Sequence, residues 1–479
     1  MPVPKVHSES PHTDTDRART TRGSETLGST PDRAAAGTTA DQRTPTTLNL
    51  RHPGSVLALQ RAVGNQRTGR LIRQRTRSGR VQRFGEQQHG GIEQEALAGS
   101  FTGEEQRDIA FGNWANDFNQ ISLAGDFIRN HTPLPVTNQD LFEIARIIAE
   151  VEFGARIARR MTPERFGAYD PQQHFDNPAT DPMAAPDLEP VARHVVSARQ
   201  RIENTLRDAA YEDDPAIARE FFGSGLHILE DFFAHTNFVE ITLRMCGVQS
   251  IDPRPGTVAG ADRNQLVGGI FATADTVVSV LHMIGNYLLR PAEPDQPITT
   301  GDRIALVLMR RASPALATAY ERFCYLDFTA RRMIPGYELI HQQVQQFKRL
   351  QAGLLGQAAN AASALVTAQA TGGGNLPTHS RLNKDDPSQP HYQLARTLAV
   401  HVVQQVTPLM QEVWRLRRAI PPTEPTYPES PAATPAMAEV QDAEARLQQV
   451  ADQHTQHPDQ GAWWRPIVEP HAARLRGGG

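Results

Sequence analysis

The segment GLHILEDFFAHTNFVE, residues 225–240, places two histidines and an aspartate at four-residue intervals among apolar and aromatic side chains. On an α-helix a step of four residues turns by about 40° beyond a full circle, so His227, Asp231 and His235 would share one face. The two histidines would lie roughly 12 Å apart along the helix, which suits two ions better than one. We therefore predict a metal site, because a cation offsets the cost of burying an unpaired carboxylate.

A buried His–Asp pair that only ties helices together is the alternative interpretation of this spacing. Two ions need more ligands than one helix offers, and other segments supply candidates. These further candidate ligands are Asp117, His174, Asp176, His379 and Asp385. Residues of these segments also have simpler interpretations. Asp176 could form an Asx turn before Asn177-Pro178, and Asp108, in the same segment as Asp117, could cap a helix. Glu230 and Glu240 would point about 100° and 140° away from Asp231 and His235, so they are weaker candidates.

Apolar residues recur at three- and four-residue spacing from about residue 100 to 420, whereas strand patterns are scarce. This periodicity predicts an all-α domain that positions the candidate ligands. The expected helices cover residues 141–153, 190–211, 215–245, 263–290, 300–332, 336–370 and 391–419. The loops at 170–182 and 375–391 are too long and too rich in His and Asp for simple connectors.

Composition divides the chain into five parts. Residues 1–54 are polar and aperiodic, which predicts disorder, and 55–99 form a short helix and an Arg-rich linker, interpreted as a loading or targeting signal or as a solvated tail. The all-α domain covers 100–420. A Pro-rich linker, 421–436, precedes a short helical C-terminal tail, 437–479.

Bulk properties exclude several classes of protein. The net charge of −4 is small, so the molecule as a whole is not an electrostatic binder of nucleic acid. Its two cysteines cannot build a disulfide framework. The N-terminus has no apolar core of a signal peptide, and no uncharged apolar run is long enough to span a bilayer. We expect a protein made in the cytoplasm that is not an integral membrane protein.

Five segments resemble signatures of the heterokaryon-incompatibility protein C (HET-C) family, in the same order over roughly residues 100–405. They are DIAFGNWANDFNQ, HFDNP, HILEDFFAHTNFVE, GGIFATADTVVSVLHMIG and PTHSRLNKDD. That family takes part in allorecognition and cell death in filamentous fungi and has bacterial members, so the resemblance implies a bacterial member. The central helix is also similar to the HxxxD helix of zinc-dependent phospholipase C and of zinc single-strand nucleases. In those all-α enzymes His, Asp and Glu bind three zinc ions, and a metal-activated water attacks the phosphodiester.

The resemblance implies roles for individual residues. Asp231 would bridge two Zn²⁺ ions, His227 and His235 would serve different ions, and Asp117, His174 and His379 would be ligands from other segments. Asp385 is a further metal ligand candidate. Asp231, Asp117 or Asp176 would be the catalytic carboxylate that orients the nucleophile. In the related enzymes the N-terminal Trp donates its free amine to a metal, but Trp114 is internal here. We therefore expect one or two ions, and three only if the chain is cut before Trp114.

The N-terminal segment VLALQRAVGNQRTGRLIRQ is similar to short segments of proteins encoded with bacterial extracellular contractile injection systems. The resemblance implies a toxin or effector exported in or on an injection particle, with its sheath, tube or tip proteins as partners. The expected enzyme is a zinc-dependent phosphodiesterase acting on phospholipid or a membrane surface, with nucleic acid as second choice. The alternatives are a non-enzymatic cell-death or binding factor and a structural or tip component of the particle.

Overall fold

The computed structural model describes residues 86–119, 136–163, 169–177, 190–253, 264–270, 284, 287, 295–337, 339–346, 379–385, 387, 389–420 and 435–477. The chain divides into two compact units, Met1–Arg80 and Val81–Gly479. Every described residue belongs to the second unit, and all that follows concerns that unit.

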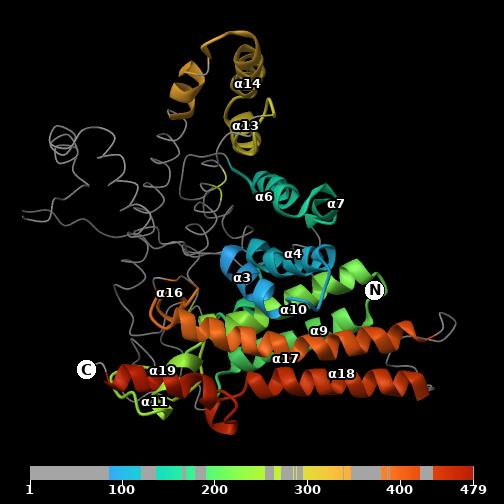
Figure 1. The fold of residues 1–479 in the computed structure, drawn as a ribbon, viewed down its shortest axis with the longest axis vertical. Coiled ribbons are helices and arrows are strands. Elements are labelled where there is room, and N and C mark those ends of the chain that lie inside the picture. Colours follow the sequence, from blue (N-terminus) through green and yellow to red (C-terminus); the bar gives the residue numbers. More distant parts are fainter. Residues whose placement is uncertain are drawn as a thin grey trace, which may run out of the picture. The chain divides into compact units, whose positions relative to one another are not determined.

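Helix α10 (Pro215–His235) is the central element of the larger hydrophobic core. Three long helices pack against it: α4 (Gly103–Asn119), α9 (Arg193–Tyr211) and α17 (Tyr392–Arg418) (Figure 1). Because α10 is apolar around most of its girth, it is stable only when surrounded in this way. The all-α fold predicted from the sequence is confirmed in the described part of the chain.

The single helix expected over 215–245 is broken into two. Thr236 is extended, and Asn237 pairs with the segment 264–270 through its backbone N–H and both ends of its side-chain amide. A new helix, α11 (Phe238–Met245), starts immediately afterwards. Helical periodicity continues across this break, so only the partner segment reveals it.

The C-terminal helices belong to the same core as α10. α18 (Pro435–His454) packs on α9 and α17, and α19 (Arg465–Gly477) packs on α11 and α17. Leu447 and Trp464 are fully buried. The described part of the expected short helical tail (437–479), residues 437–477, therefore closes one side of the hydrophobic core.

A second buried cluster connects α4 to α6 (Asn138–Phe153) and α13 (Thr300–Ala312). α13 in turn packs on α14 (Pro314–Met333). One helix was expected over 300–332, but it ends at Ala312. Ser313 is extended, its side chain caps α14, and the proline that follows has no N–H to continue the first helix.

Short elements complete the described structure. They are α3 (Glu86–Ala96), α7 (Ala155–Ala158), α16 (His379–Leu382) and the 3₁₀ turns η1 (Pro171–His174) and η2 (Pro458–Gln460). The described ranges contain isolated β-bridges and no strand. The disorder expected for 1–54, the helix starting at Ser55, most of the helices expected over 263–290 and 336–370, and the linker up to residue 434 lie outside the described residues.

Candidate metal centre

Helix α10 presents His227, Asp231 and His235 on one buried face, each at most 2% exposed. His227 Nε2 lies 3.1 Å and His235 Nδ1 lies 3.4 Å from the same atom, Asp231 Oδ2. One carboxylate oxygen therefore receives imidazoles from the turn before it and the turn after it.

His174 and Asp117 join this face near His227. His174 ends η1, a turn that Asp170 caps, and its Nδ1 lies 3.0 Å from Asp231 Oδ2 and 3.3 Å from His227 Nε2. Asp117, on α4, places its Oδ1 3.8 Å from His227 Nε2. Its side chain is 14% exposed whereas those of the other residues are fully buried, so solvent reaches the cluster at Asp117.

The remaining predicted residues lie at the His235 end. Asp385, in the loop after α16, places Oδ2 2.6 Å from His235 Nε2. Asp176 accepts hydrogen bonds from His379 Nδ1, at 2.7 Å, and from the Tyr169 hydroxyl. The rings of His235 and His379 are 4.3 Å apart. Asp176 is thus a buried hydrogen-bond partner of His379 and Tyr169.

His89 is a member of the cluster that the sequence analysis missed. It lies on α3, before residue 100, with Nδ1 2.6 Å from Glu230 Oε2 and Nε2 3.5 Å from Asp231 Oδ1. Glu230, which was expected to point away from the face of Asp231, is connected to the cluster through its hydrogen bond with His89. The sequence does carry a signal, since His89, Ile92, Glu93 and Ala96 repeat with helical spacing. The two adjacent glycines, Gly90 and Gly91, and the Arg-rich run before the helix make this helical pattern difficult to recognise in the sequence.

Three of the histidines have Nδ1 held by a side chain other than Asp231, and a fourth, His235, has Nδ1 3.3 Å from the His174 carbonyl oxygen. His89 donates to Glu230 and His379 donates to Asp176. Asn113 uses its NH₂ group for Glu93 and Glu230, so its carbonyl oxygen accepts from His227 Nδ1 at 3.1 Å. A histidine held this way directs the Nε2 lone pair toward a metal, the usual arrangement around protein-bound ions.

The helix crossing that brings Asn113 and Asp117 to His227 depends on two glycines. A Cβ on Gly112 would lie 1.9 Å from the Glu220 carbonyl oxygen, and one on Gly223 would lie 1.9 Å from the Ile109 carbonyl oxygen. α4 and α10 are therefore in backbone contact. Any side chain at either position would separate them.

Burial and neighbouring charges shift the pKa values of several residues in the cluster. Burial favours the neutral acid at Asp231, but the charges of His227 and His235 outweigh it and hold the pKa well below its usual range. Burial disfavours a charged His235, yet Asp231 and Asp385 raise its pKa to about 9. Burial also raises the pKa of Glu230. Five carboxylates, Asp117, Asp176, Glu230, Asp231 and Asp385, meet five imidazoles here, so balancing the negative charge takes protons on the imidazoles or bound cations.

The described residues contain three groupings whose ligand atoms lie within 4.8 Å of one another and could hold an ion. They are His89–His227–Asp231, Asp117–His174–His227 and Asp231–His235–Asp385. Imidazole nitrogens and carboxylate oxygens are donors that Zn²⁺ accepts. Asp231 Oδ1 fits a ligand role, because it is fully buried and has no hydrogen-bond partner within the described structure. His379 and Asp176 belong to none of the three groupings.

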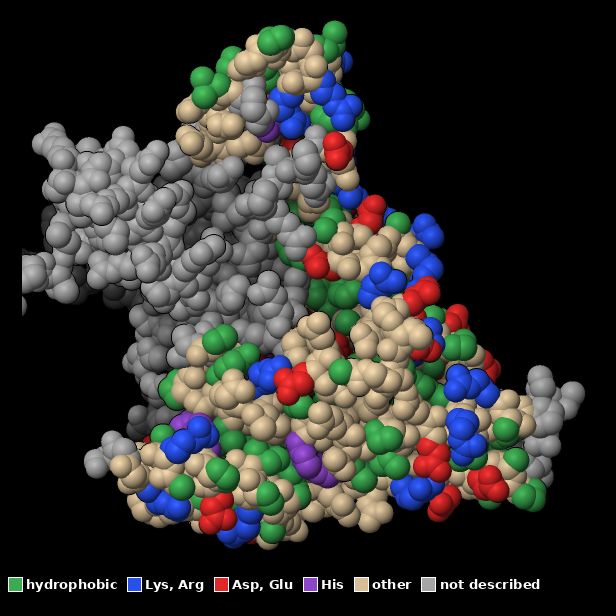
Figure 2. Space-filling model, viewed as in Figure 1, with side chains coloured by type: hydrophobic (Ala, Val, Ile, Leu, Met, Phe, Trp, Pro, Cys, Tyr) green, Lys and Arg blue, Asp and Glu red, His purple; other side chains and the backbone are tan. Residues whose placement is uncertain are grey.

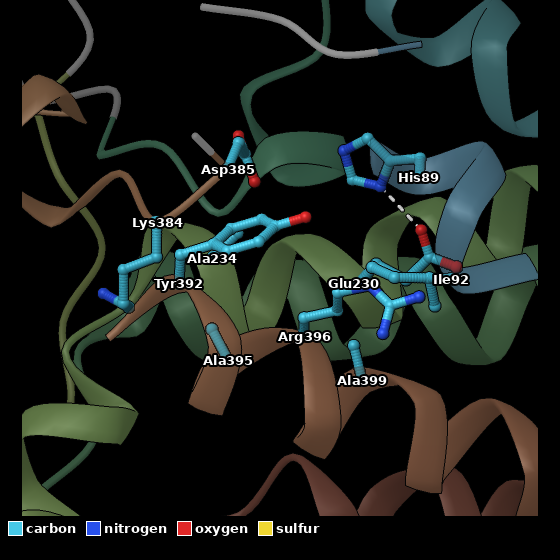
Figure 3. A pocket seen from close by; sticks show the side chains of 10 residues that line it. All are labelled: His89, Ile92, Glu230, Ala234, Lys384, Asp385, Tyr392, Ala395, Arg396 and Ala399. Atoms are coloured by element: carbon cyan, nitrogen blue, oxygen red, sulfur yellow. Dashed lines mark hydrogen bonds and ion pairs between the residues drawn. The ribbon is translucent and has the colours of Figure 1, made fainter. Parts of the chain in front are cut away.

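A small pocket opens beside this cluster, between α3, α10, α17 and the loop at 384–385. His89 and Asp385, members of two different groupings, both line it together with Tyr392 (Figure 3). Lys384 also lines the pocket, but its ammonium group is committed to Glu240 at 3.0 Å and to two backbone carbonyls. Glu240 is therefore an ion-pair partner.

Two other residues quoted from the sequence have structural roles. Asp108 lies inside α4 and bonds Arg160 and Arg219, so it does not cap the helix. The Trp114 ring packs with Phe118 in the second hydrophobic cluster. Its backbone nitrogen is part of α4.

Comparisons with known proteins agree with the family resemblance. Residues 188–290, which include α9, α10 and α11, match the family model described as heterokaryon incompatibility protein Het-C. The chain is also similar to von Willebrand factor A domain-containing protein 7 of Rattus norvegicus, 32% identical over 115 residues, and of Mus musculus, 31% identical. These matches cover 22% of this chain and 13% of each relative. No solved structure matches the chain significantly.

Helix length and hydropathy also bear on membranes. Within the described ranges, none of the helices combines the length and the apolar character that crossing a bilayer requires.

Proposed function

We propose that the protein is a metal-dependent phosphodiesterase that acts on phospholipid, with nucleic acid as the second substrate class. The observation that supports this proposal is that the three ligand groupings are connected: two of them share Asp231 and two share His227. Zinc ions held by these groupings would supply a nucleophile at neutral pH and would neutralise charge on phosphoryl oxygens. The roles below are those of the chain's own side chains.

Asp231 is the central carboxylate, within 3.5 Å of four histidine rings. Asp117 has the most exposed carboxylate of the three groupings, so we assign it the acceptance of a proton from the attacking water. Asp176 and Glu230 orient His379 and His89, and are positioning residues. The buried wall of α10 excludes bulk water behind the cluster and strengthens each charge interaction.

The match to the Het-C family supports a biological role in cell death or incompatibility. We propose that the chain is a toxin or effector. Residues 56–74, which resemble cargo of contractile injection systems, support delivery by such a particle. Its sheath, tube or tip proteins would then be the binding partners.

The test uses the full chain purified without chelator. Mass spectrometry measures bound metal, and hydrolysis is followed on phosphatidylcholine and on single-stranded DNA for wild type and Asp231→Asn. Asp327→Asn is the matched control, because Asp327 is also a buried aspartate paired with a histidine, His341, but lies on α14. We expect zinc and activity in wild type and control only. A chain that purifies without metal and gains no activity with added Zn²⁺ would contradict the proposal.

One observation favours a second candidate, a non-enzymatic cell-death factor. His89–Glu230, His235–Asp385 and His379–Asp176 are paired at 2.6–2.7 Å, a geometry that also fits a structural charge network. A folded His227→Ala variant would distinguish the two. Toxicity that survives this substitution supports the structural network, and lost toxicity supports the metal site.

A further inference from the structure

The outer side of α14 and of the segment that follows it is apolar. Most large hydrophobic side chains found exposed in the described structure lie between residues 316 and 340. They are Leu316, Phe323, Tyr325, Leu326, Met333, Ile334, Leu339 and Ile340. Leu326 is 69% and Met333 74% exposed, although soluble proteins rarely gather such residues on one surface. Figure 2 shows hydrophobic side chains and arginines exposed together over α13 and α14.

Helix geometry places three of these side chains on one face of α14. Leu326 and Met333 are seven residues apart and Phe323 precedes Leu326 by three, so all three share a face. Ala317 and Cys324 are the buried positions on the inner side, where α14 meets α13. The exposed apolar side chains are thus not needed for the described packing of this helix.

The exposed charged residues of α14 are arginines, whereas Glu321 on the same helix is half-buried. Arg322 and Arg332 are exposed, and the ion pair of Arg332 with Asp295 is 3.9 Å long between exposed groups, which makes it weak. Asp327 is buried and paired with His341 and Arg331, so its charge does not offset the two exposed arginines.

We propose that this face, formed by α14, residues 334–337 and residues 339–340, docks on an anionic phospholipid surface. Apolar and aromatic side chains interspersed with arginine are what interfacial helices use: the rings and aliphatic chains enter the headgroup region while the guanidinium groups meet lipid phosphates. A second copy of the chain fits less well, because a two-fold contact would bring together two faces that both carry exposed arginines. The proposal does not depend on hydrolysis.

The test is flotation of the full chain with vesicles of phosphatidylcholine alone and of phosphatidylcholine with a third phosphatidylserine. We expect the wild type to bind the anionic vesicles. The double substitution Leu326→Glu with Met333→Glu should reduce this binding at least tenfold, because each substitution removes an apolar side chain that would enter the headgroup region and adds a charge that the anionic lipid repels. The double substitution Arg322→Ala with Arg332→Ala should weaken binding about 25-fold, because each arginine near an anionic surface contributes about fivefold to the binding constant. Val196→Glu, at a position 49% exposed on α9, is the matched control and should bind as wild type does.

Circular dichroism must show equal helix content in all variants, since the substituted side chains face solvent. Asp231→Asn should bind vesicles normally, which keeps this proposal separate from the metal centre. Equal binding of wild type and the Leu326/Met333 variant would overturn it. So would a dimer in light scattering that the same variant dissociates, because the face would then be covered by a second copy.

Discussion

Replacing Asp231 by Asn is the sharpest test of the metal centre, because it keeps the shape of the side chain and removes its charge. Asp231 contributes to two of the three groupings, so the variant keeps only Asp117, His174 and His227. We expect it to lose at least one bound ion and the stability linked to that ion.

The size of the effect follows from linkage. An ion present at 100 times its dissociation constant stabilises the folded state by about 2.7 kcal/mol, provided that it does not bind the unfolded chain. Two such ions would contribute about 5 kcal/mol. With roughly 2 °C for each kcal/mol in a large domain, the wild-type melting temperature should rise by about 10 °C with Zn²⁺. The Asp231→Asn variant should gain about half of that or less.

Differential scanning fluorimetry with and without Zn²⁺ measures these shifts, and mass spectrometry of the same samples gives the metal content. Asp327→Asn, in the His341 pair on α14, should lose stability equally with and without Zn²⁺. Our reasoning is refuted if Asp231→Asn binds as much zinc as wild type and shows the same shift.

Three further predictions follow from the structure. Gly112→Ala should destabilise the chain by about 1–3 kcal/mol in urea unfolding, because its Cβ would meet the Glu220 carbonyl at 1.9 Å; an unchanged midpoint would disprove the backbone contact. Glu230→Gln should weaken zinc affinity about 10- to 100-fold in a competition titration, because it loosens His89; equal affinity would exclude the positioning role. Burial raises the pKa of Asp108, but bonds to nearby arginines outweigh it and lower that pKa. This stabilisation is present above the unfolded pKa of about 3.9 and is lost as pH falls through the folded value. Asp108→Asn should therefore cost about 2–4 kcal/mol near pH 7, and a difference that does not shrink in acid would contradict the ion-pair account.

The sequence by itself determined the helical class and the face of α10. Four-residue spacing is a local property of the helix, so His227, Asp231 and His235 had to lie together once that helix formed. The histidines and aspartates concentrated in the loops also marked segments that the structure brings to this face, with His174 and Asp385 next to it.

Only the tertiary structure decided which groups meet. The break at Asn237 depends on a segment that follows about thirty residues later, and the helix crossing depends on backbone contact at Gly112 and Gly223. His89 reaches Asp231 only because α3 packs against α4 and α17. Contacts of this kind join residues that are distant in the chain, and no local spacing encodes them. The sequence therefore named most of the ligand candidates, and packing selected their partners.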